Sequence, residues 1–428
     1  MALSKMGYRT RIIDDIIEIK LKSFGALCIE GPKWCGKTWT ALNHSTSAFF
    51  IGDPKNNFQN RTLASIDPSL VLDGESPRLI DEWQEVPSLW DAVRFEVDNM
   101  PNKGRFILTG SSTPKNVGIM HSGTGRIDRI LMRPMSLYES GDSDGSVSLM
   151  SIFNQQSIRT GVHQTSLQNL AYLATRGGWP GAIGMNESQA IDISRSYLKT
   201  LVNDDISRVD GIKRDQKKVK SLLKSLARNV STSVSNQVLI RDMKEFDNDS
   251  IDSNTLSSYL DVLTRLFVIH SQPAFDVNYR SSQRVGKTPK RHFIDPSLAI
   301  AALELSPSML INDLHLFGFI FESLVIRDLT IYAEANRGLV SHFRHHDTGD
   351  EIDAVVELDD GRWGAFEIKL GHNQVDEAAE NLLKIKKNFD ESNPQKSPTV
   401  LCVVCGLAEY AYKRNDGVYV VPITALKN

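Results

Sequence analysis

The amino-acid sequence predicts an α/β protein with several domains, and three observations lead to this prediction. The chain has 428 residues, which is too long for one compact hydrophobic core. Short apolar segments alternate with helical patterns over residues 1–140, as they do in a parallel sheet covered by helices. A further pair of apolar segments with strand periodicity lies near the C-terminus, after a stretch whose pattern is mainly helical.

The clearest motif follows the first predicted strand, residues 26–30. Residues 31–38 fit the pattern G-x-x-x-x-G-K-[ST], and residues 39–43 can begin a helix. The glycines let backbone N–H groups turn toward phosphate oxygens, and the helix N-terminus adds the positive end of its dipole. The predicted nucleotide-binding residues are Gly31, Pro32, Lys33, Trp34, Cys35, Gly36, Lys37 and Thr38.

A second apolar strand, residues 78–81, ends in two carboxylates. We expect Lys37 to reach the β- and γ-phosphates of the nucleotide. Thr38 and Asp81 are expected to hold Mg²⁺, directly or through water. Glu82 is the predicted base that orients the attacking water. The two motifs together predict a protein that binds a nucleoside triphosphate with Mg²⁺ and hydrolyses it.

Two further segments fit this chemistry. Residues 105–112 predict an apolar strand that ends in hydroxyls, where a polar sensor of the γ-phosphate would lie. Thr109 is the first choice for this sensor and Ser111 the second. Arg126 or Arg129, at the next predicted strand, is a candidate arginine finger, in the same chain or in a neighbouring subunit of a homo-oligomer. The alternative for each is a surface arginine in a loop.

The motifs resemble those of the AAA-type ATPases that carry a DUF4143 region at the C-terminus. The resemblance covers nearly the whole chain and is carried by residues 31–38, 79–82, 106–112, 125–126, 133–139, 177–181 and 290–296. One departure lies in the phosphate loop, where family members often have Arg-Gln and this chain has Lys33 and Trp34. These variable positions do not touch the phosphate chemistry, so ATP binding is still expected.

The composition is that of a soluble globular protein, with 41% hydrophobic and 24% charged residues. No apolar stretch approaches the ~20 residues that span a bilayer, and the first residues contain no apolar signal core. Four cysteines fit a reducing compartment. Cys402 and Cys405 lie in an apolar run that predicts a buried strand and not a zinc site. A cytoplasmic protein without membrane contact is expected.

Three domains are predicted along the chain. Residues 1–208 form the P-loop ATPase core with a helical lid, which is broken at residues 177–180. Residues 209–308 form a winged-helix-like helical unit, in which Asp252 caps one helix and a short hairpin follows. Residues 309–428 form an α/β restriction-nuclease-like domain.

The net charge of −3 does not by itself indicate nucleic-acid binding, but basic residues crowd two segments. Residues 213–228 are either a solvated helix face or a surface that contacts DNA phosphates. Residues 280–291 would form the wing of a winged helix. Alternatively, the helical unit packs against the ATPase core or binds a protein partner. His342, His345 and His346 are expected to form a basic, exposed patch.

The C-terminal domain is predicted from a hairpin. Residues 351–358 and 363–370 alternate as half-buried strands, and the segment between them has the composition of a turn. In the predicted register Asp353 lies opposite Glu367 and shares a face with Lys369. The apolar side chains of the two strands, which include Ile352, point into a core.

Asp353, Glu367 and Lys369 resemble the core of the PD-(D/E)xK nucleases. The resemblance implies that Asp353 and Glu367 hold Mg²⁺ at a scissile phosphate, and Glu322, on a predicted helix upstream, could complete the site. Lys369 would lower the pKa of the attacking water or stabilise charge on the phosphate.

Two alternatives stay open for this hairpin. It can be a solvated hairpin with surface ion pairs, or a nuclease-like domain that binds without cleaving. Two functions therefore remain. The chain is an ATPase whose C-terminal half engages DNA, with possible Mg²⁺-dependent cleavage, or it is a nucleotide-gated switch that binds a protein partner.

Overall fold

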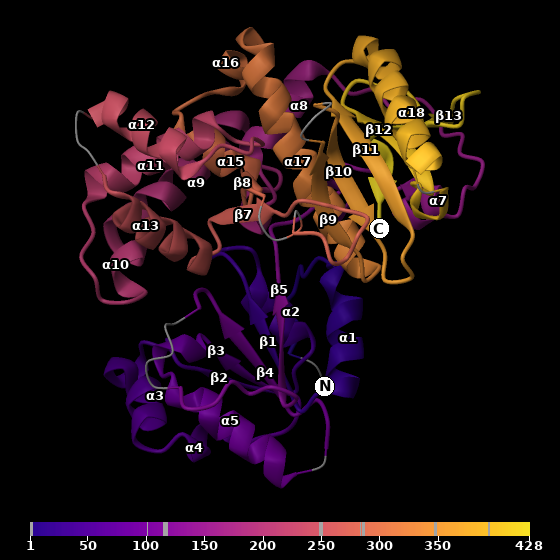
Figure 1. The fold of residues 1–428 in the computed structure, drawn as a ribbon. Helices are drawn as coiled ribbons and strands as arrows, with labels where there is room; N and C mark the ends of the chain where they lie inside the picture. The colour runs from indigo at the N-terminus through magenta and orange to yellow at the C-terminus, as the bar shows by residue number, and fades with distance from the viewer. Residues whose placement is uncertain are drawn as a thin grey trace.

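The computed structural model describes residues 3–100, 102–113, 119–247, 251–282, 284, 287–345, 349–392 and 394–428. The molecule has two parts (Figure 1). The N-terminal part, below in the view, is a sheet with helices on its faces. The larger part above it holds a helical unit on one side and a second sheet on the other.

The N-terminal sheet has five parallel strands in the order β2-β3-β4-β1-β5. The central strands β1 and β4 are continuous apolar runs, and every residue in them is buried. Helices cover both faces, so that the part has two hydrophobic clusters. The elements are α1 (Ile13–Ser23), β1 (Ala26–Glu30), α2 (Lys37–Asn43), β2 (Ser47–Phe50), α3 (Lys55–Ile66), α4 (Ser69–Leu72), β3 (Arg78–Asp81), α5 (Ser88–Asn99), β4 (Phe106–Gly110) and β5 (Ile127–Leu131).

The chain then crosses to the larger part, where β6 and α7 lie beside the second sheet and residues 167–312 form the helical unit (Figure 1). The predicted break at residues 177–180 is confirmed, since α8 ends at Arg176 and α9 begins at Glu187. Asp252 caps α13, as predicted, by accepting bonds from the N–H groups of Asn254 and Thr255. The elements are α6 (Leu137–Ser140), β6 (Val147–Ser148), α7 (Leu149–Phe153), α8 (Leu167–Arg176), α9 (Glu187–Thr200), α10 (Ile206–Arg208), α11 (Gln216–Arg228), α12 (Asn236–Asp247), α13 (Ser253–Arg265), β7 (Ile269–Gln272), β8 (Lys290–Phe293), α15 (Pro296–Ala302) and α16 (Pro307–Asn312).

The second sheet has six strands in the order β13-β14-β12-β11-β10-β9. Helix α17 packs on one face and helix α18 on the other, and Cys402 and Cys405 are buried in β12, as predicted. The elements are α17 (Leu314–Ala335), β9 (Leu339–Arg344), β10 (Glu351–Glu357), β11 (Trp363–Lys369), α18 (Val375–Ser392), β12 (Val400–Cys405), β13 (Tyr412–Lys413), β14 (Tyr419–Pro422) and β15 (Leu426–Lys427).

The predicted hairpin register is confirmed, because Ala354 pairs with Phe366 in the antiparallel ladder. The expectation of half-buried strands is wrong, since both faces of the hairpin are covered by helices. Ile352 also departs from the predicted core. It joins the cluster under α18, whereas Ala354 lies under α17, because the ladder with β9 is irregular between Ile352 and Val355.

A buried ion-pair network ties the segments of the larger part together. The guanidinium of Arg327, on α17, lies 2.9 Å from Asp295 and 2.8 Å from Asp328. Asp295 also accepts a bond from the N–H of Gly178, and Asp328 accepts one from the N–H of Leu137. The network therefore joins the segments at residues 137, 178, 295 and 327.

Most buried hydrophobic side chains between residues 137 and 426 form one continuous cluster, and a smaller cluster lies between the second sheet and α18. Both are separate from the two clusters of the N-terminal part. The predicted domain limits at residues 208 and 308 stay predictions, and both lie inside the range of the larger cluster. Within the described residues, none of the helices has the length and apolar content needed to cross a membrane.

Candidate functional site

The phosphate loop lies between β1 and α2, in the strand–loop–helix context that the motif requires. Gly31 and Gly36 both have positive φ angles, of 155° and 102°. A Cβ atom on Gly31 would lie 2.2 Å from the carbonyl oxygen of Met132, so only glycine fits there. The buried Lys37 ammonium donates to the carbonyl oxygens of Gly31 and Pro32, at 2.9 and 2.7 Å.

Asp81 lies at the end of β3, beside the start of α2. Its Oδ1 accepts bonds from the hydroxyls of Thr38, at 2.8 Å, and Thr109, at 2.6 Å. Burial raises the pKa of Asp81, although the two hydroxyls lower it in part. The adjacent hydroxyl of Thr38 and carboxylate of Asp81 are the hard oxygen donors that Mg²⁺ prefers, so this pair fits the predicted ion.

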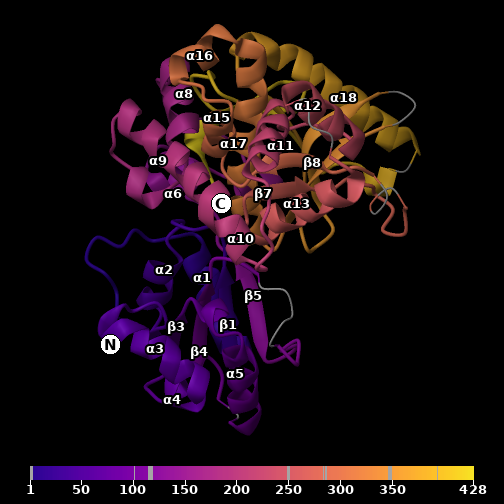
Figure 2. The ribbon, with the colours of Figure 1, turned by 90° about the vertical axis from the view of Figure 1, so that its left-hand side faces the viewer.

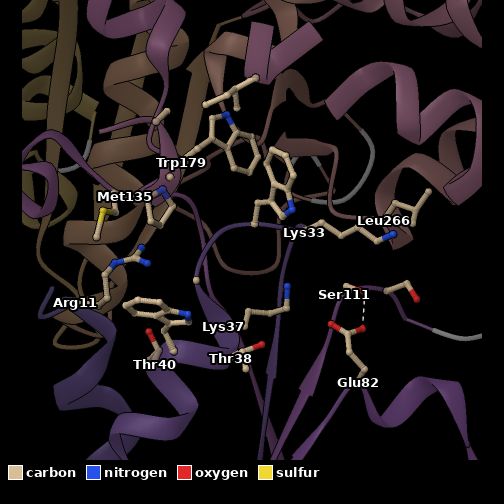
Figure 3. A pocket seen from close by; sticks show the side chains of 18 of the residues that line it. Arg11, Lys33, Lys37, Thr38, Thr40, Glu82, Ser111, Met135, Trp179 and Leu266 are labelled. Atoms are coloured by element: carbon tan, nitrogen blue, oxygen red, sulfur yellow. Dashed lines mark hydrogen bonds between the residues drawn. The ribbon is translucent and has the colours of Figure 1, made fainter. Parts of the chain in front are cut away.

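Glu82 follows directly and faces a different hydroxyl. Its Oε2 accepts a bond from Ser111 at 2.8 Å and another from the side-chain amide of Gln84. Glu82 has φ of 60°, a left-handed conformation that is uncommon outside glycine and concentrates at functional sites. The two predicted sensors therefore bond to different carboxylates: Thr109 donates to Asp81 and Ser111 donates to Glu82. Figure 3 shows the contact between Glu82 and Ser111 and, beside it, Lys37 and Thr38.

These groups face a cavity of about 1200 Å³ between the two parts of the molecule. The lower wall is formed by the phosphate loop, with Trp34 and Trp39 largely exposed. The upper wall comes from the helical unit, which contributes Trp179 and Leu266 (Figure 3). The cavity is therefore open to a ligand that touches both parts at once.

Two residues of the upper wall were not predicted. Asp205 lies in a π-helical turn, Leu201–Asp205, and its carboxylate is 2.5 Å from the ammonium of Lys33. Arg208, on the next turn, also lines the cavity, and Figure 2 shows α10 at the boundary between the two parts. Single charged residues so distant from the loop in sequence give no motif, so sequence reasoning had no signal for them. Lys33, which stands where family members often have arginine, thus links the phosphate loop of the N-terminal part to the larger part.

The candidate arginine fingers lie elsewhere. Arg126 precedes β5 at the end of the sheet opposite the phosphate loop, and its guanidinium lies 2.7 Å from Asp98. Arg129 lies within β5, 2.6 Å from Glu30 and over the ring of Trp90. The structure does not bring either arginine to the cavity of its own chain.

The second predicted constellation comes together at the edge of a cavity of about 790 Å³ in the larger part. The Lys369 ammonium lies 2.6 Å from Glu367 and 3.5 Å from Asp353. Asp353 Oδ2 also accepts the N–H of Ile368 at 2.9 Å. Glu322 projects from α17, as predicted, and is buried. The alternative of a solvated hairpin with surface ion pairs is wrong, because Glu367 is buried and the side chain of Asp353 is only 14% exposed.

An unpredicted cation lies among these carboxylates. The ammonium of Lys290, on β8, is 2.8 Å from Glu351, 3.1 Å from Glu322 and 3.7 Å from Asp353. We refer to Glu322, Glu351, Asp353 and Glu367 as the carboxylate cluster.

Charge and burial act in opposite directions on this cluster. Burial lowers the pKa of Lys290, but Glu322, Asp353 and Glu351 outweigh it and raise that pKa above its usual range. Burial, followed by the charge of Asp353, raises the pKa of Glu322 to about 8 and also raises that of Glu367. Burial opposes the ionisation of Asp353, yet Lys369 and Lys290 hold its pKa below the usual range.

The Mg²⁺ predicted for Asp353, Glu367 and Glu322 stays a prediction. Across the described ranges, no group of three or more His, Cys, Asp or Glu side chains is arranged to hold a metal ion. The predicted histidine patch is also corrected, since His342 is buried in β9 while His345 is exposed and His346 lies outside the described residues.

Comparisons with known proteins match three parts of the chain. Residues 23–140 match the family described as AAA domain. Residues 167–309 match a domain of unknown function, DUF8612, which includes both the predicted lid and the predicted winged-helix-like unit. Residues 317–426 match a domain of unknown function, DUF4143.

Two curated relatives are uncharacterized proteins of Mycobacterium tuberculosis and Mycobacterium bovis. Each is 24% identical over 345 residues, which is 80% of this chain and 69% of the relative. A solved structure, a Walker-type ATPase of Pyrococcus abyssi, is 12% identical, with a TM-score of 0.44 over 70% of this chain and 97% of that chain.

Proposed function

The chain is an AAA-type ATPase with a C-terminal DUF4143 region, and we propose that it uses ATP to change how its larger part engages DNA. The observation that carries the ATPase half of this proposal is the pairing of Thr38 with Asp81 and of Ser111 with Glu82 around Lys37. These are the kinds of group that phosphoryl transfer to water uses, which supports the proposal.

In this proposal the loop N–H groups and Lys37 bind the phosphates, and Thr38 and Asp81 hold Mg²⁺. The ion would neutralise charge on the β- and γ-phosphates. Glu82, fixed by Ser111 and Gln84, orients the attacking water. Thr109 positions Asp81, because its hydroxyl bonds to the same oxygen as Thr38 does.

Arg208 is a second candidate for the cationic group that stabilises transition-state charge. It lines the cavity from the helical unit of the same chain, whereas Arg126 would have to act on a neighbouring subunit. Nucleotide bound between the phosphate loop and α10 would draw the two parts together. This contact is the proposed route from ATP to the larger part.

The DNA half of the proposal rests on exposed lysines of the helical unit. Lys213, Lys217 and Lys220 are exposed on or next to α11, where they can contact phosphates. The predicted wing is less available, because Arg284 pairs with Glu357 and Lys290 lies in the carboxylate cluster. The nucleotide-gated switch that binds a protein partner remains the alternative, and the unavailable wing favours it.

The salt dependence of DNA affinity separates the two. For a surface that contacts phosphates, the logarithm of the binding constant falls steeply with that of salt concentration, and Lys217→Ala with Lys220→Ala should reduce the slope by about 2. A flat dependence in wild type would favour the protein-partner function.

Cleavage needs a separate assay. Wild type, Asp353→Ala and the control Asp359→Ala, whose carboxylate is exposed in the turn after β10, are incubated with circular duplex and single-stranded DNA. Reactions contain Mg²⁺ or Mn²⁺, with or without ATP. Cleavage by wild type and Asp359→Ala, but not by Asp353→Ala, would support a metal nuclease at Asp353, Glu367 and Lys369. Intact DNA beside normal ATP turnover would support a nuclease-like domain that does not cleave.

A further inference from the structure

We propose that the Lys290 ammonium is the resident cation of the carboxylate cluster and that it excludes divalent metal while the β7–β8 hairpin is docked on the second sheet. The inference goes beyond the proposed function, because it concerns metal binding alone and holds whether or not the chain binds DNA.

The first support is the spacing of the cluster. Three carboxylates, from α17 and β10, surround the Lys290 ammonium at 2.8 to 3.7 Å. These are distances between nitrogen and oxygen, whereas Mg²⁺ holds its oxygens at about 2.1 Å and Ca²⁺ at about 2.4 Å. In the structure these side chains are therefore arranged around an ammonium.

The second support is burial. The side chain of Lys290 is 4% exposed, so its charge cannot be solvated by water. Lys369, the other cation of the site, is 27% exposed and lies between Asp353 and Glu367. Lys290 thus has the enclosed position among the carboxylates, and Lys369 has the outer one.

The third support is the fixed position of the hairpin. Gln272, on β7, donates to the carbonyl oxygens of Ser341 and Asp353, at 3.0 and 2.9 Å. The N–H of Phe275 donates to the carbonyl of His342 at 2.7 Å, and Arg284 pairs with Glu357. The hairpin therefore covers β9, the edge strand of the sheet, and β8 carries Lys290 into the cluster. A surface lysine would have neither this backbone attachment nor this enclosure.

The hairpin is also close in sequence to the nucleotide cavity. The N–H of Thr113, just after β4, donates to the carbonyl of Arg265, at the end of α13, and the Arg265 guanidinium donates to the carbonyl of Thr113. The next residue, Leu266, lines the cavity. The strand β7 begins at Ile269. A change at the nucleotide site can therefore reach the hairpin through a few residues.

The test measures Mn²⁺ binding by nucleotide-free protein, from the loss of the electron paramagnetic resonance signal of free Mn²⁺. The variants are Lys290→Met, Asp353→Asn, Lys290→Met combined with Asp353→Asn, and Lys287→Met as a control in the same hairpin. Lys287 donates to the carbonyl of Arg344 and not to a carboxylate of the cluster. Thermal unfolding and ATP binding report whether each variant is folded.

We expect wild type and Lys287→Met to show no Mn²⁺ binding that depends on Asp353, and Lys290→Met to gain one Mn²⁺ site. The double variant should lose that site. A wild-type Mn²⁺ site that Asp353→Asn removes would overturn the proposal, as would a folded Lys290→Met that gains none. If Lys290→Met does not fold, Lys290→Gln takes its place in the test for a gained Mn²⁺ site. The comparison of wild type with Asp353→Asn needs no change at Lys290 and still tests whether wild type binds Mn²⁺ at the cluster.

Discussion

Replacing Glu82 with glutamine keeps the shape of the side chain and removes its ability to accept a proton from water. In the structure Glu82 receives bonds from Ser111 and Gln84 and makes none to Lys37 or Thr38. The change should therefore leave the affinity for ATP within about threefold of wild type, since the phosphate-binding groups are untouched.

The expected loss of turnover follows from the role of Glu82. A positioned general base contributes about 10² to 10⁴ in rate, which is about 2.7 to 5.4 kcal/mol of activation free energy. Ser111→Ala removes one of two bonds that position the carboxylate. A bond to a charged group contributes about 1.5 to 3 kcal/mol, so its loss should slow turnover by about ten- to one-hundredfold.

The assay is phosphate release at saturating ATP with Mg²⁺, together with equilibrium binding of a fluorescent ATP analogue. Glu85→Gln is the matched control, because Glu85 lines the same cavity but its carboxylate pairs with Arg61. A Glu82→Gln protein that hydrolyses ATP at the wild-type rate would refute the assignment of the base. So would a loss of ATP binding that accounts for the whole effect.

Three other changes test separate parts of the structure. Arg327→Met leaves two buried carboxylates without their cation and should reduce the free energy of unfolding by about 3 to 5 kcal/mol, measured by urea denaturation; an unchanged midpoint would contradict the network. The pKa of Glu322 is raised from 4.5 to about 8, so the folded state binds the proton more tightly and stability should fall as pH rises from 4.5 through 8, by at most about 1.4 kcal/mol per pH unit. Glu322→Gln should flatten this part of the profile of melting temperature against pH, and an identical profile would count against it. Arg208→Ala should lower the rate of ATP hydrolysis at least tenfold with little change in ATP affinity, while Arg241→Ala, on the exposed face of α12, should not; equal rates for both variants would leave Arg208 without a role.

Local signals made the nucleotide site predictable. The loop at residues 31–38 and the carboxylates after β3 occur at fixed positions relative to strand ends, so their meeting follows from the parallel sheet. The predicted AAA-type ATPase with a DUF4143 region is confirmed by the matches to both families. The hairpin register was predictable too, because alternation and turn length fix which residues face each other.

Long-range packing was not predictable in the same way. Half-buried strands were expected at β10 and β11, because alternation of charged and apolar residues is typical of one solvated face. Glu351 and Asp353 instead pair with Lys290, which lies on a hairpin more than sixty positions earlier in the sequence. Lys33 and Asp205 likewise meet only because the two parts lie against each other. No periodicity or motif marks such pairs.

The central claim is that the loop with Lys37 binds and hydrolyses ATP, and the most direct test is Lys37→Ala. Binding of ATP and release of phosphate are measured for wild type, for Lys37→Ala and for Lys55→Ala, whose ammonium is largely exposed outside the cavity. The account predicts normal values for wild type and Lys55→Ala, and for Lys37→Ala a loss of turnover to near background with affinity reduced at least tenfold. Normal affinity and turnover in Lys37→Ala would contradict the assignment of the phosphate loop.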